Sequence, residues 1–163
     1  YKVEKIDTHG GSIRIYVKKN SKTKIGKSVK LFLKQEEKFG IKSYETYQDF
    51  AKKIYKIRDN VRKNISKLVQ NNNKIIGYGS PAKATTSLNF FGISNEINYI
   101  VEDNKLKQGM FLPGVRIPIK SKKKLKEKVD TVIVLAWNFF KEIKKNNSKL
   151  SNNFISIKDL GID

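Results

Sequence analysis

The most constraining feature of the sequence is a strand–turn–helix pattern between residues 74 and 91. The apolar pair Ile75-Ile76 leads into the tight turn Gly77-Tyr78-Gly79, and residues 82–91 can then form a helix. A turn of this kind leaves the first amides of the helix unpaired and pointing outward, where an anion fits. We therefore predict a ligand site at this corner and interpret most of the chain as its scaffold.

Composition narrows the class of protein. The chain has 163 residues, which is enough for one domain with a hydrophobic core. It has no cysteine and one histidine, so disulfides, thiolate metal sites and histidine clusters are excluded, and we expect no bound metal. No apolar run reaches the ~18 residues of a membrane span, and the sequence starts at Tyr1 without a signal-peptide pattern. We expect a cytoplasmic protein, and we interpret this sequence as a piece of a longer one.

The net charge of +20 is compatible with a polyanionic partner. Only four of the 35 basic residues are arginine, and Lys, Asn and Ile are abundant along the whole chain, as in a genome biased toward AT codons. Proteins that read nucleic acids usually rely on Arg for base edges. We therefore favour the codon-bias explanation and keep a charge-driven nucleic-acid-binding domain as an alternative.

A second glycine loop lies near the start of the sequence. Residues 3–17 predict two strands around this loop, because apolar and polar side chains alternate from Ile13 to Lys18. Gly10-Gly11 permits a positive φ and a close backbone approach to a ligand. His9 is then either a proton carrier or phosphate donor, or an exposed side chain in a hairpin turn.

Two helices are predicted between this hairpin and the central corner. Residues 28–39 form the first helix, with Gly40 as its stop. Ser43 is a good N-cap for a much longer helix, whose apolar residues recur every three or four positions up to Val69. We interpret that stripe as packing against the sheet or against a missing neighbouring domain.

The remaining sequence predicts an alternation of short strands and helical segments. The strands are expected at residues 97–101, 115–119, 131–136 and 153–157, and the helical turns at 122–128 and 137–145. Pro118 makes the second of these an edge strand. The predicted fold class is α/β, with a Rossmann-like, mostly parallel sheet and flanking helices, preceded by a β-hairpin and long helices.

Ligands of such sheets bind beyond the carboxyl ends of the strands, where residues 77–83, 102–104 and 137–139 are expected. The first segment matches G-x-G-x-x-[GA], and Asp103 lies about 20 residues further on, which indicates a dinucleotide site. Pro81 has no backbone amide that could contact a phosphate, although proline suits a first helical position. The domain also has fewer than the six strands of a full dinucleotide-binding fold. A nucleotide diphosphate therefore fits better than NAD. Lys83 is either a phosphate partner or one more surface lysine.

Four ordered motifs cover nearly the whole chain and resemble a known family. They are Thr8-His9-Gly10-Gly11-Ser12-Ile13-Arg14, then Gly77-Tyr78-Gly79-Ser80-Pro81-Ala82-Lys83 with Leu88-Asn89, then Lys107-Gln108-Gly109 with Leu112-Pro113-Gly114 and Ile117-Pro118-Ile119, and finally Leu135-Ala136-Trp137-Asn138-Phe139. In this order and spacing the sequence resembles the C-terminal domain of SAM-dependent C-methyltransferases that act on nucleotide-linked keto-deoxysugars. Ser80 stands where this family often has Ala, a change that does not affect the expected fold.

The resemblance implies a division of labour between domains. An N-terminal zinc-binding domain and a central SAM domain would precede this Rossmann-like domain, and the sugar nucleotide would lie between the central and C-terminal domains. S-adenosylmethionine would be bound by the missing domain and not by this fragment. The family's catalytic Tyr and His also belong to the missing domain, so we expect no catalytic residue here, with His9 at most an accessory, and we expect this fragment alone to be inactive.

On this basis residues 1–19 are a hairpin that continues from the methyltransferase domain, residues 20–72 a helical segment, and residues 73–163 the substrate-binding domain. Together these segments are expected to hold the nucleotide diphosphate so that one carbon of the sugar faces the methyl group of SAM. A stand-alone nucleotide- or NAD-binding module, with Asp103 on a ribose, and an interaction domain that docks a partner through its long helix remain alternatives. The predicted substrate-binding residues are Thr8, His9, Gly10, Gly11, Ser12, Arg14, Gly77, Gly79, Ser80, Pro81, Ala82, Lys83, Gln108 and Asn138.

Overall fold

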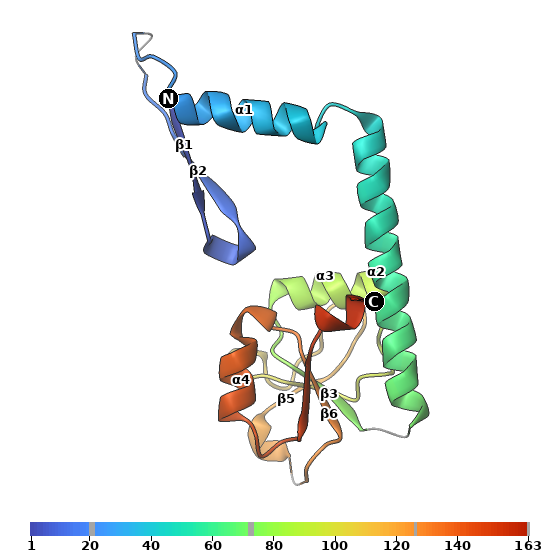
Figure 1. The fold of residues 1–163 in the computed structure, drawn as a ribbon. Coiled ribbons are helices and arrows are strands. Elements are labelled where there is room, and N and C mark those ends of the chain that lie inside the picture. The colour runs from blue at the N-terminus through green and yellow to red at the C-terminus, as the bar shows by residue number, and fades with distance from the viewer. Residues whose placement is uncertain (20–21, 72–73, 126, 163) are drawn as a thin grey trace. The chain divides into compact units, whose positions relative to one another are not determined.

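A computed structural model describes residues 1–19, 22–71, 74–125 and 127–162 (Figure 1). The chain divides into two compact units, residues 1–53 and residues 54–163. The boundary falls inside the longest helix. We describe each unit by itself.

The first unit contains the predicted hairpin and the first predicted helix. Strands β1 (Lys2–Ile6) and β2 (Ser12–Tyr16) are antiparallel and are joined by the 3-10 turn η1 (Thr8–Gly10). Helix α1 (Lys27–Phe39) ends at Gly40, whose φ of +80° is left-handed. Helix α2 (Tyr44–Gln70) begins in the first unit and continues into the second. The structure confirms the strands and both helices predicted for this region.

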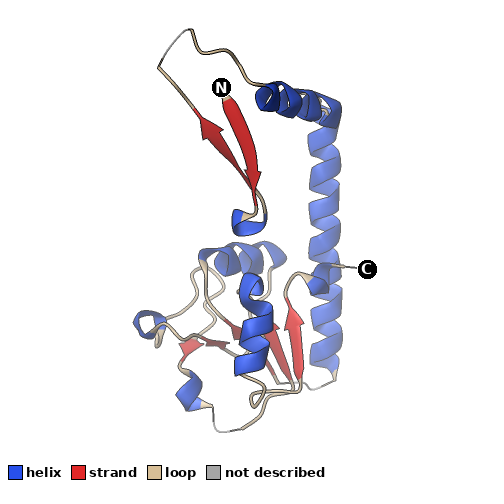
Figure 2. Cartoon of the chain, turned by 60° about the vertical axis from the view of Figure 1, so that its left-hand side comes forward, coloured by secondary structure: helices blue, strands red, loops and turns tan. Residues whose placement is uncertain are grey.

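The second unit is built on a five-stranded, entirely parallel sheet in the order β5-β4-β3-β6-β7. Helix α3 follows β3, and helix α4 connects β6 to β7 (Figure 2). This confirms the α/β fold class and the edge position predicted for the strand at 115–119, although that strand is shifted to Ile119–Lys120. The bounds are β3 (Ile75–Tyr78), α3 (Ala82–Phe91), β4 (Ile100–Val101), η2 (Lys105–Lys107), β5 (Ile119–Lys120), η3 (Lys122–Lys124), β6 (Thr131–Val134), η4 (Trp137–Phe139), α4 (Phe140–Asn146), β7 (Asn153–Ser156) and η5 (Asp159–Gly161).

Three predicted elements were wrong in extent. The strand at 97–101 is reduced to its last two residues, and the helix expected at 122–128 is the short 3-10 turn η3, with residue 126 outside the described part. The strand at 115–119 begins only at Ile119, because residues 112–117 fold into a tight turn. In this turn the Leu112 amide donates to the Ile117 carbonyl at 2.9 Å, and Arg116 has a φ of +56°.

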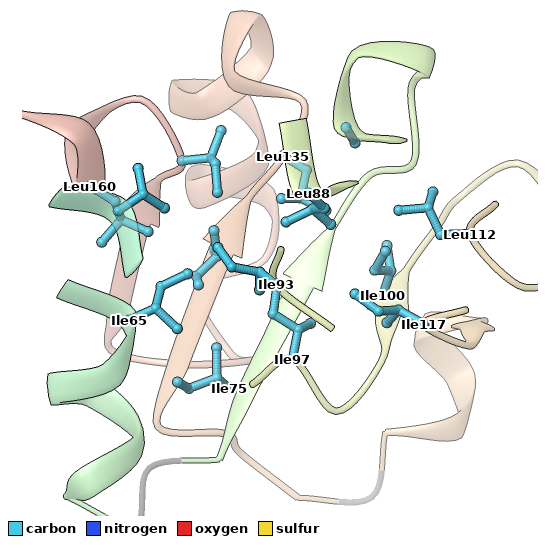
Figure 3. Packing of buried hydrophobic residues seen from close by; sticks show 14 of the residues in the cluster. Ile65, Ile75, Leu88, Ile93, Ile97, Ile100, Leu112, Ile117, Leu135 and Leu160 are labelled. Carbon is cyan, nitrogen blue, oxygen red and sulfur yellow. The ribbon is translucent and has the colours of Figure 1, made fainter. Parts of the chain in front are cut away.

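Apolar side chains cover both faces of the sheet. One face packs against α2 and α3, through residues such as Ile65 and Leu88, and Figure 3 shows Leu88 beside Leu135 in this cluster. The other face packs against α4 through Phe140 and its neighbours. The sheet is therefore buried on both sides, as parallel sheets are, and its strand ends form the edge that is free to meet a ligand.

Candidate functional site

The centre of the sheet contains a topological switch point. Neighbouring strands β3 and β6 are parallel, and the chain leaves them through α3 and α4, which pack on opposite faces. Open α/β sheets bind ligands beyond the strand ends at such points. Gly79 follows β3 here with a φ of +83°, and a Cβ added to it would lie 2.8 Å from the Ala136 Cβ. Only glycine allows the two strand ends to approach so closely.

A cleft of about 600 Å³ opens at this edge of the sheet. Its walls come from the residues that follow β3, β4, β5 and β6 and from α4. It is lined by Tyr78, Gly79, Ser80, Pro81, Glu102, Asp103, Asn104, Lys107, Lys122, Ala136, Phe139, Glu142, Ile143, Asn146 and Asn147. Residues from four distant parts of the sequence therefore line one cleft.

Tyr78 anchors a polar network in this cleft. Its hydroxyl donates to Asp103 Oδ2 at 2.8 Å and lies 3.3 Å from Asn147 Oδ1. Asn147 Oδ1 accepts a hydrogen bond from Lys122 Nζ, and its Nδ2 donates to the Ile143 carbonyl at 2.8 Å. Burial, together with the hydrogen bond to Asp103, raises the pKa of Tyr78 well above its ordinary value. Tyr78 therefore keeps its proton and acts as a donor at neutral pH.

Glu102 forms the other side of the network. Its Oε2 accepts from the Ser80 amide at 2.8 Å and from the Ser80 hydroxyl at 2.6 Å, and its Oε1 accepts from the Asn104 amide at 3.0 Å. Burial by itself would raise the pKa of Glu102, but the hydrogen bonds from Asn104 and Ser80, with Lys107 nearby, outweigh it and lower the pKa. An ionised carboxylate thus holds the loop after β3.

Comparison with known protein families places almost the whole chain in one family. The profile of a family described as the C-methyltransferase C-terminal domain matches residues 7–156. The chain belongs to this family. The resemblance carried by the four sequence motifs is thereby confirmed at the level of the C-methyltransferase C-terminal domain.

A second comparison finds a named enzyme that is similar along most of the chain. C-methyltransferase NovU from Streptomyces niveus is 32% identical over 154 residues, which cover 93% of this chain and 37% of NovU. The chain thus spans little more than a third of the length of the relative that it matches.

Three of the predicted site residues of this C-methyltransferase C-terminal domain line the cleft, namely Gly79, Ser80 and Pro81. Pro81 is the N-cap of α3 and not its first helical residue, with a φ of −69° and a ψ of 162°. The Ser80 amide, one of the donors expected to face a phosphate, donates to Glu102 in this structure.

The other predicted residues of the second unit lie outside the cleft. Gly77 is a packing position, since an added Cβ would lie 3.0 Å from both Ile100 Cγ1 and Leu135 Cδ1. Gln108 Nε2 donates to the Glu102 carbonyl at 2.7 Å and so supports the loop after β4. Asn138 is exposed in a neighbouring cleft at the ends of β6 and β7.

Lys83 and Ala82 lie in the first turn of α3. Lys83 Nζ lies 4.1 Å from the centroid of the Trp137 ring, a cation–π contact that fixes its position beside the strand ends. In this structure the Lys83 side chain is therefore directed toward Trp137, and its role as a phosphate partner stays a prediction.

The predicted residues of the hairpin share one turn in the first unit. Ser12 Oγ donates to the Thr8 carbonyl at 3.0 Å, and the Gly11 amide donates to the same carbonyl at 3.1 Å. Gly10 and Gly11 both have a positive φ, as predicted. Arg14 is exposed on β2, and His9 lies in η1, although its side chain is outside the described part.

Sequence reasoning missed several residues of the cleft: Tyr78 as a donor, Lys107, Lys122 and Asn147. Lys122 and Asn147 follow β5 and α4, and no local pattern marks either residue. Glu102 was marked only by its place after the predicted second strand, and Asp103 was marked also by its distance from the glycine turn. The rule that ligands bind beyond the carboxyl ends of parallel strands was the one signal that could have found more residues of the cleft.

The described residues, 1–19, 22–71, 74–125 and 127–162, were also considered as a metal site and as a membrane segment by their arrangement alone. Within these ranges, no group of three or more His, Cys, Asp or Glu side chains is arranged to hold a metal ion. None of the helices described is long and apolar enough to cross a membrane.

Proposed function

We propose that this chain is the substrate-holding domain of a SAM-dependent C-methyltransferase, and that its cleft receives the nucleotide-diphosphate part of a nucleotide-linked keto-deoxysugar. The observation that carries the proposal is the cleft at the β3–β6 switch point, where charged side chains of both signs surround the glycine turn. Membership of the C-methyltransferase C-terminal domain family supports it.

The carboxylates of the cleft suit the hydroxyl groups of a ribose. Glu102 and Asp103 follow β4, the strand next to β3. In sheets with this strand order, an acidic residue after the second strand accepts hydrogen bonds from ribose hydroxyls. Asp103 is exposed and uses Oδ2 for Tyr78, which aligns the carboxylate at the mouth of the cleft.

The lysines of the cleft suit the diphosphate. Lys107 Nζ donates to the Ser80 carbonyl at 2.8 Å, and Lys122 Nζ donates to Asn147 Oδ1. Both ammonium groups are thereby held in the wall of the cleft. The amides of Ala82 and Lys83, the first two residues of α3, have no acceptor within the helix, whereas the Ala84 amide donates to the Pro81 carbonyl at 2.9 Å. The positive end of the helix dipole adds to the attraction of the first two amides for an anion.

In the proposed reaction, the role of this chain is to orient the substrate. A carbon next to a ketone must lose a proton before it attacks a methyl group, so a base must sit near that carbon. SAM supplies the methyl group, and we assign SAM and the base to the preceding part of the polypeptide. The cleft fixes the nucleotide end of the substrate, so that the sugar presents one carbon to the methyl donor. The hairpin residues, His9 among them, would contact the sugar. We place the whole enzyme in the cytoplasm.

The test is calorimetric titration of the full-length polypeptide with a thymidine-diphospho-sugar. Lys122→Ala should weaken binding about 10-fold, because it removes one cation from the diphosphate. Lys123→Ala is the matched control, since Lys123 is exposed and does not line the cleft, and it should leave binding unchanged. Equal affinities for Lys122→Ala and the parent would contradict the proposed site.

The same titration separates the alternatives. A nucleotide- or NAD-binding module predicts tight binding of NAD that Asp103→Asn weakens. A nucleic-acid-binding domain predicts binding of a short DNA duplex that falls steeply with salt and ignores Lys122→Ala. Either result, without binding of the nucleotide sugar, would overturn the methyltransferase proposal.

A further inference from the structure

Asn147 is a buried polar residue at the end of α4. It is 5% exposed, and it is the C-cap of that helix. Its Nδ2 group donates to the Ile143 carbonyl at 2.8 Å, and its Oδ1 accepts from Lys122 Nζ. A carbonyl oxygen only accepts hydrogen bonds and an ammonium group only donates them, so these two neighbours fix which end of the amide faces which. The position therefore needs a side chain with a donor at one end and an acceptor at the other.

The contacts of Lys122 leave its charge uncompensated. Its ammonium group donates to Asn147 Oδ1 and lies 3.4 Å from the Asn146 carbonyl oxygen, and both of these partners are neutral. Among the ion pairs of the described ranges, none includes Lys122. Lys107 differs, because its positive charge helps to stabilise the ionised carboxylate of Glu102. Of these two lysines, Lys122 is therefore the one whose charge is left for a ligand.

Asn147 also stands between Lys122 and the carboxylate of Asp103. Asn147 Oδ1 lies 3.3 Å from the Tyr78 hydroxyl, which donates to Asp103 Oδ2 at 2.8 Å. The contacts thus run from the ammonium group through one amide and one phenol to the carboxylate. Both intervening groups are neutral, since burial raises the pKa of Tyr78 and keeps its hydroxyl protonated. An ion pair between Lys122 and Asp103 would cancel the charge that an anionic ligand needs, and these two neutral side chains keep its partners apart.

We propose that Asn147 is a positioning residue that makes the cleft specific for a phosphorylated ligand, because its neutral amide holds the Lys122 ammonium group without cancelling its charge. A carboxylate at this position would neutralise the ammonium group, and an apolar side chain would leave it free to move toward Asp103. Hydrogen bonds between ionised groups are roughly twice as strong as neutral ones, so the uncancelled charge matters most for a phosphate. The inference rests on the proposed function, since it assumes that Lys122 contacts the diphosphate.

The test is a double-mutant cycle on the full-length polypeptide, measured by calorimetric titration with a thymidine-diphospho-sugar. Asn147→Ala and Lys122→Ala should each weaken binding about 10-fold. The double variant should also lose about 10-fold, and not about 100-fold, because both substitutions remove the same ammonium contact. A loss of about 100-fold in the double variant would show that Asn147 acts independently of Lys122 and would overturn the proposal, as would parent-like binding by Asn147→Ala.

Ser151→Ala is the matched control for the loss of a buried hydrogen bond. Ser151 is 2% exposed and does not line the cleft, and its hydroxyl donates to the Asp130 carbonyl at 2.8 Å. Both Ser151→Ala and Asn147→Ala should lower the thermal midpoint, but Ser151→Ala should leave the affinity for the nucleotide sugar unchanged. Equal weakening of binding in the two variants would show that lost stability, and not the position of Lys122, explains the effect.

Asn147→Asp tests whether the neutrality of the amide matters. The new carboxylate can accept the same hydrogen bond from Lys122 but cancels its charge, so binding should weaken about 10-fold or more. The substitution also places a carboxylate oxygen against the Ile143 carbonyl, so the thermal midpoint is measured first, and the alanine cycle decides the matter if this variant does not fold. Parent-like affinity in folded Asn147→Asp would overturn the role of the neutral amide.

A failure of this inference can be told apart from a failure of the proposed function. If the parent does not bind the nucleotide sugar, or if Lys122→Ala binds it as tightly as the parent, the cleft is not the diphosphate site and both proposals fail. If Lys122→Ala weakens binding but Asn147→Ala does not, the proposed function stands and only the role of Asn147 is wrong.

Discussion

At the scale of the residue, Gly79 controls how closely the ends of β3 and β6 approach. Gly79→Ala combines a left-handed φ with a Cβ that would lie 2.8 Å from the Ala136 Cβ. Gly109 is the matched control, since its φ is +86° and nothing lies within 4 Å of an added Cβ. Urea denaturation should show a loss of about 1 kcal/mol for Gly109→Ala and about 3 kcal/mol for Gly79→Ala. Equal losses would mean that the contact with Ala136 relaxes freely.

Glu102 should make the free energy of unfolding depend on pH in the acidic range. Hydrogen bonds from Asn104 and Ser80 lower the pKa of Glu102 below its ordinary value of 4.5, despite the opposing effect of burial. A carboxyl group with a lowered pKa in the folded state contributes stability above the ordinary value, and this contribution is lost as pH falls below it. The free energy of unfolding should therefore fall less between pH 5 and 3 in Glu102→Gln than in the parent, measured by urea titration at each pH. An identical slope would show that Glu102 does not hold the loop.

At the scale of the element, the two halves of α2 have different neighbours. Ile65 is 1% exposed and packs in the core of the second unit, whereas Phe50 is 62% exposed. Ile65→Ala should cost about 3 kcal/mol of stability in urea denaturation, and Phe50→Ala about 0.5 kcal/mol or less. A large cost for Phe50→Ala in the full-length polypeptide, but not in this chain, would show that a neighbouring domain covers the first half of the helix.

At the scale of the whole molecule, the net charge of +20 should assist any phosphorylated ligand. Salt screens this long-range field, with a Debye length of about 10 Å at 0.1 M and about 3 Å at 1 M. The association rate of the nucleotide sugar should therefore fall several-fold between 0.05 and 0.5 M NaCl, measured by stopped-flow fluorescence, while Lys122→Ala mainly raises the dissociation rate. A salt-independent association rate would mean that the scattered lysines do not steer the ligand.

Local patterns determined much of this fold. The end of α1 at Gly40 and the pairing of the hairpin follow from a glycine stop and from alternation, each of which acts within a few residues. The start of α2 directly after Ser43 and the bounds of α3 also agree with the prediction. The strand expected at 115–119 was misplaced because the turn around Arg116 depends on hydrogen bonds that its apolar residues do not reveal. The family motifs, being ordered over the whole sequence, also identified the C-methyltransferase C-terminal domain.

The composition of the cleft was decided only by the tertiary structure. Tyr78, Asp103, Lys122 and Asn147 follow or end separate elements, and the strand order of the sheet brings them together. The same holds for the Ser80 amide, whose acceptor is a carboxylate 22 residues further along the chain. Sequence periodicity determines which face of an element is buried, because that depends on near neighbours. Which strand ends meet depends on the order of strands in the sheet, and that order is a property of the folded chain.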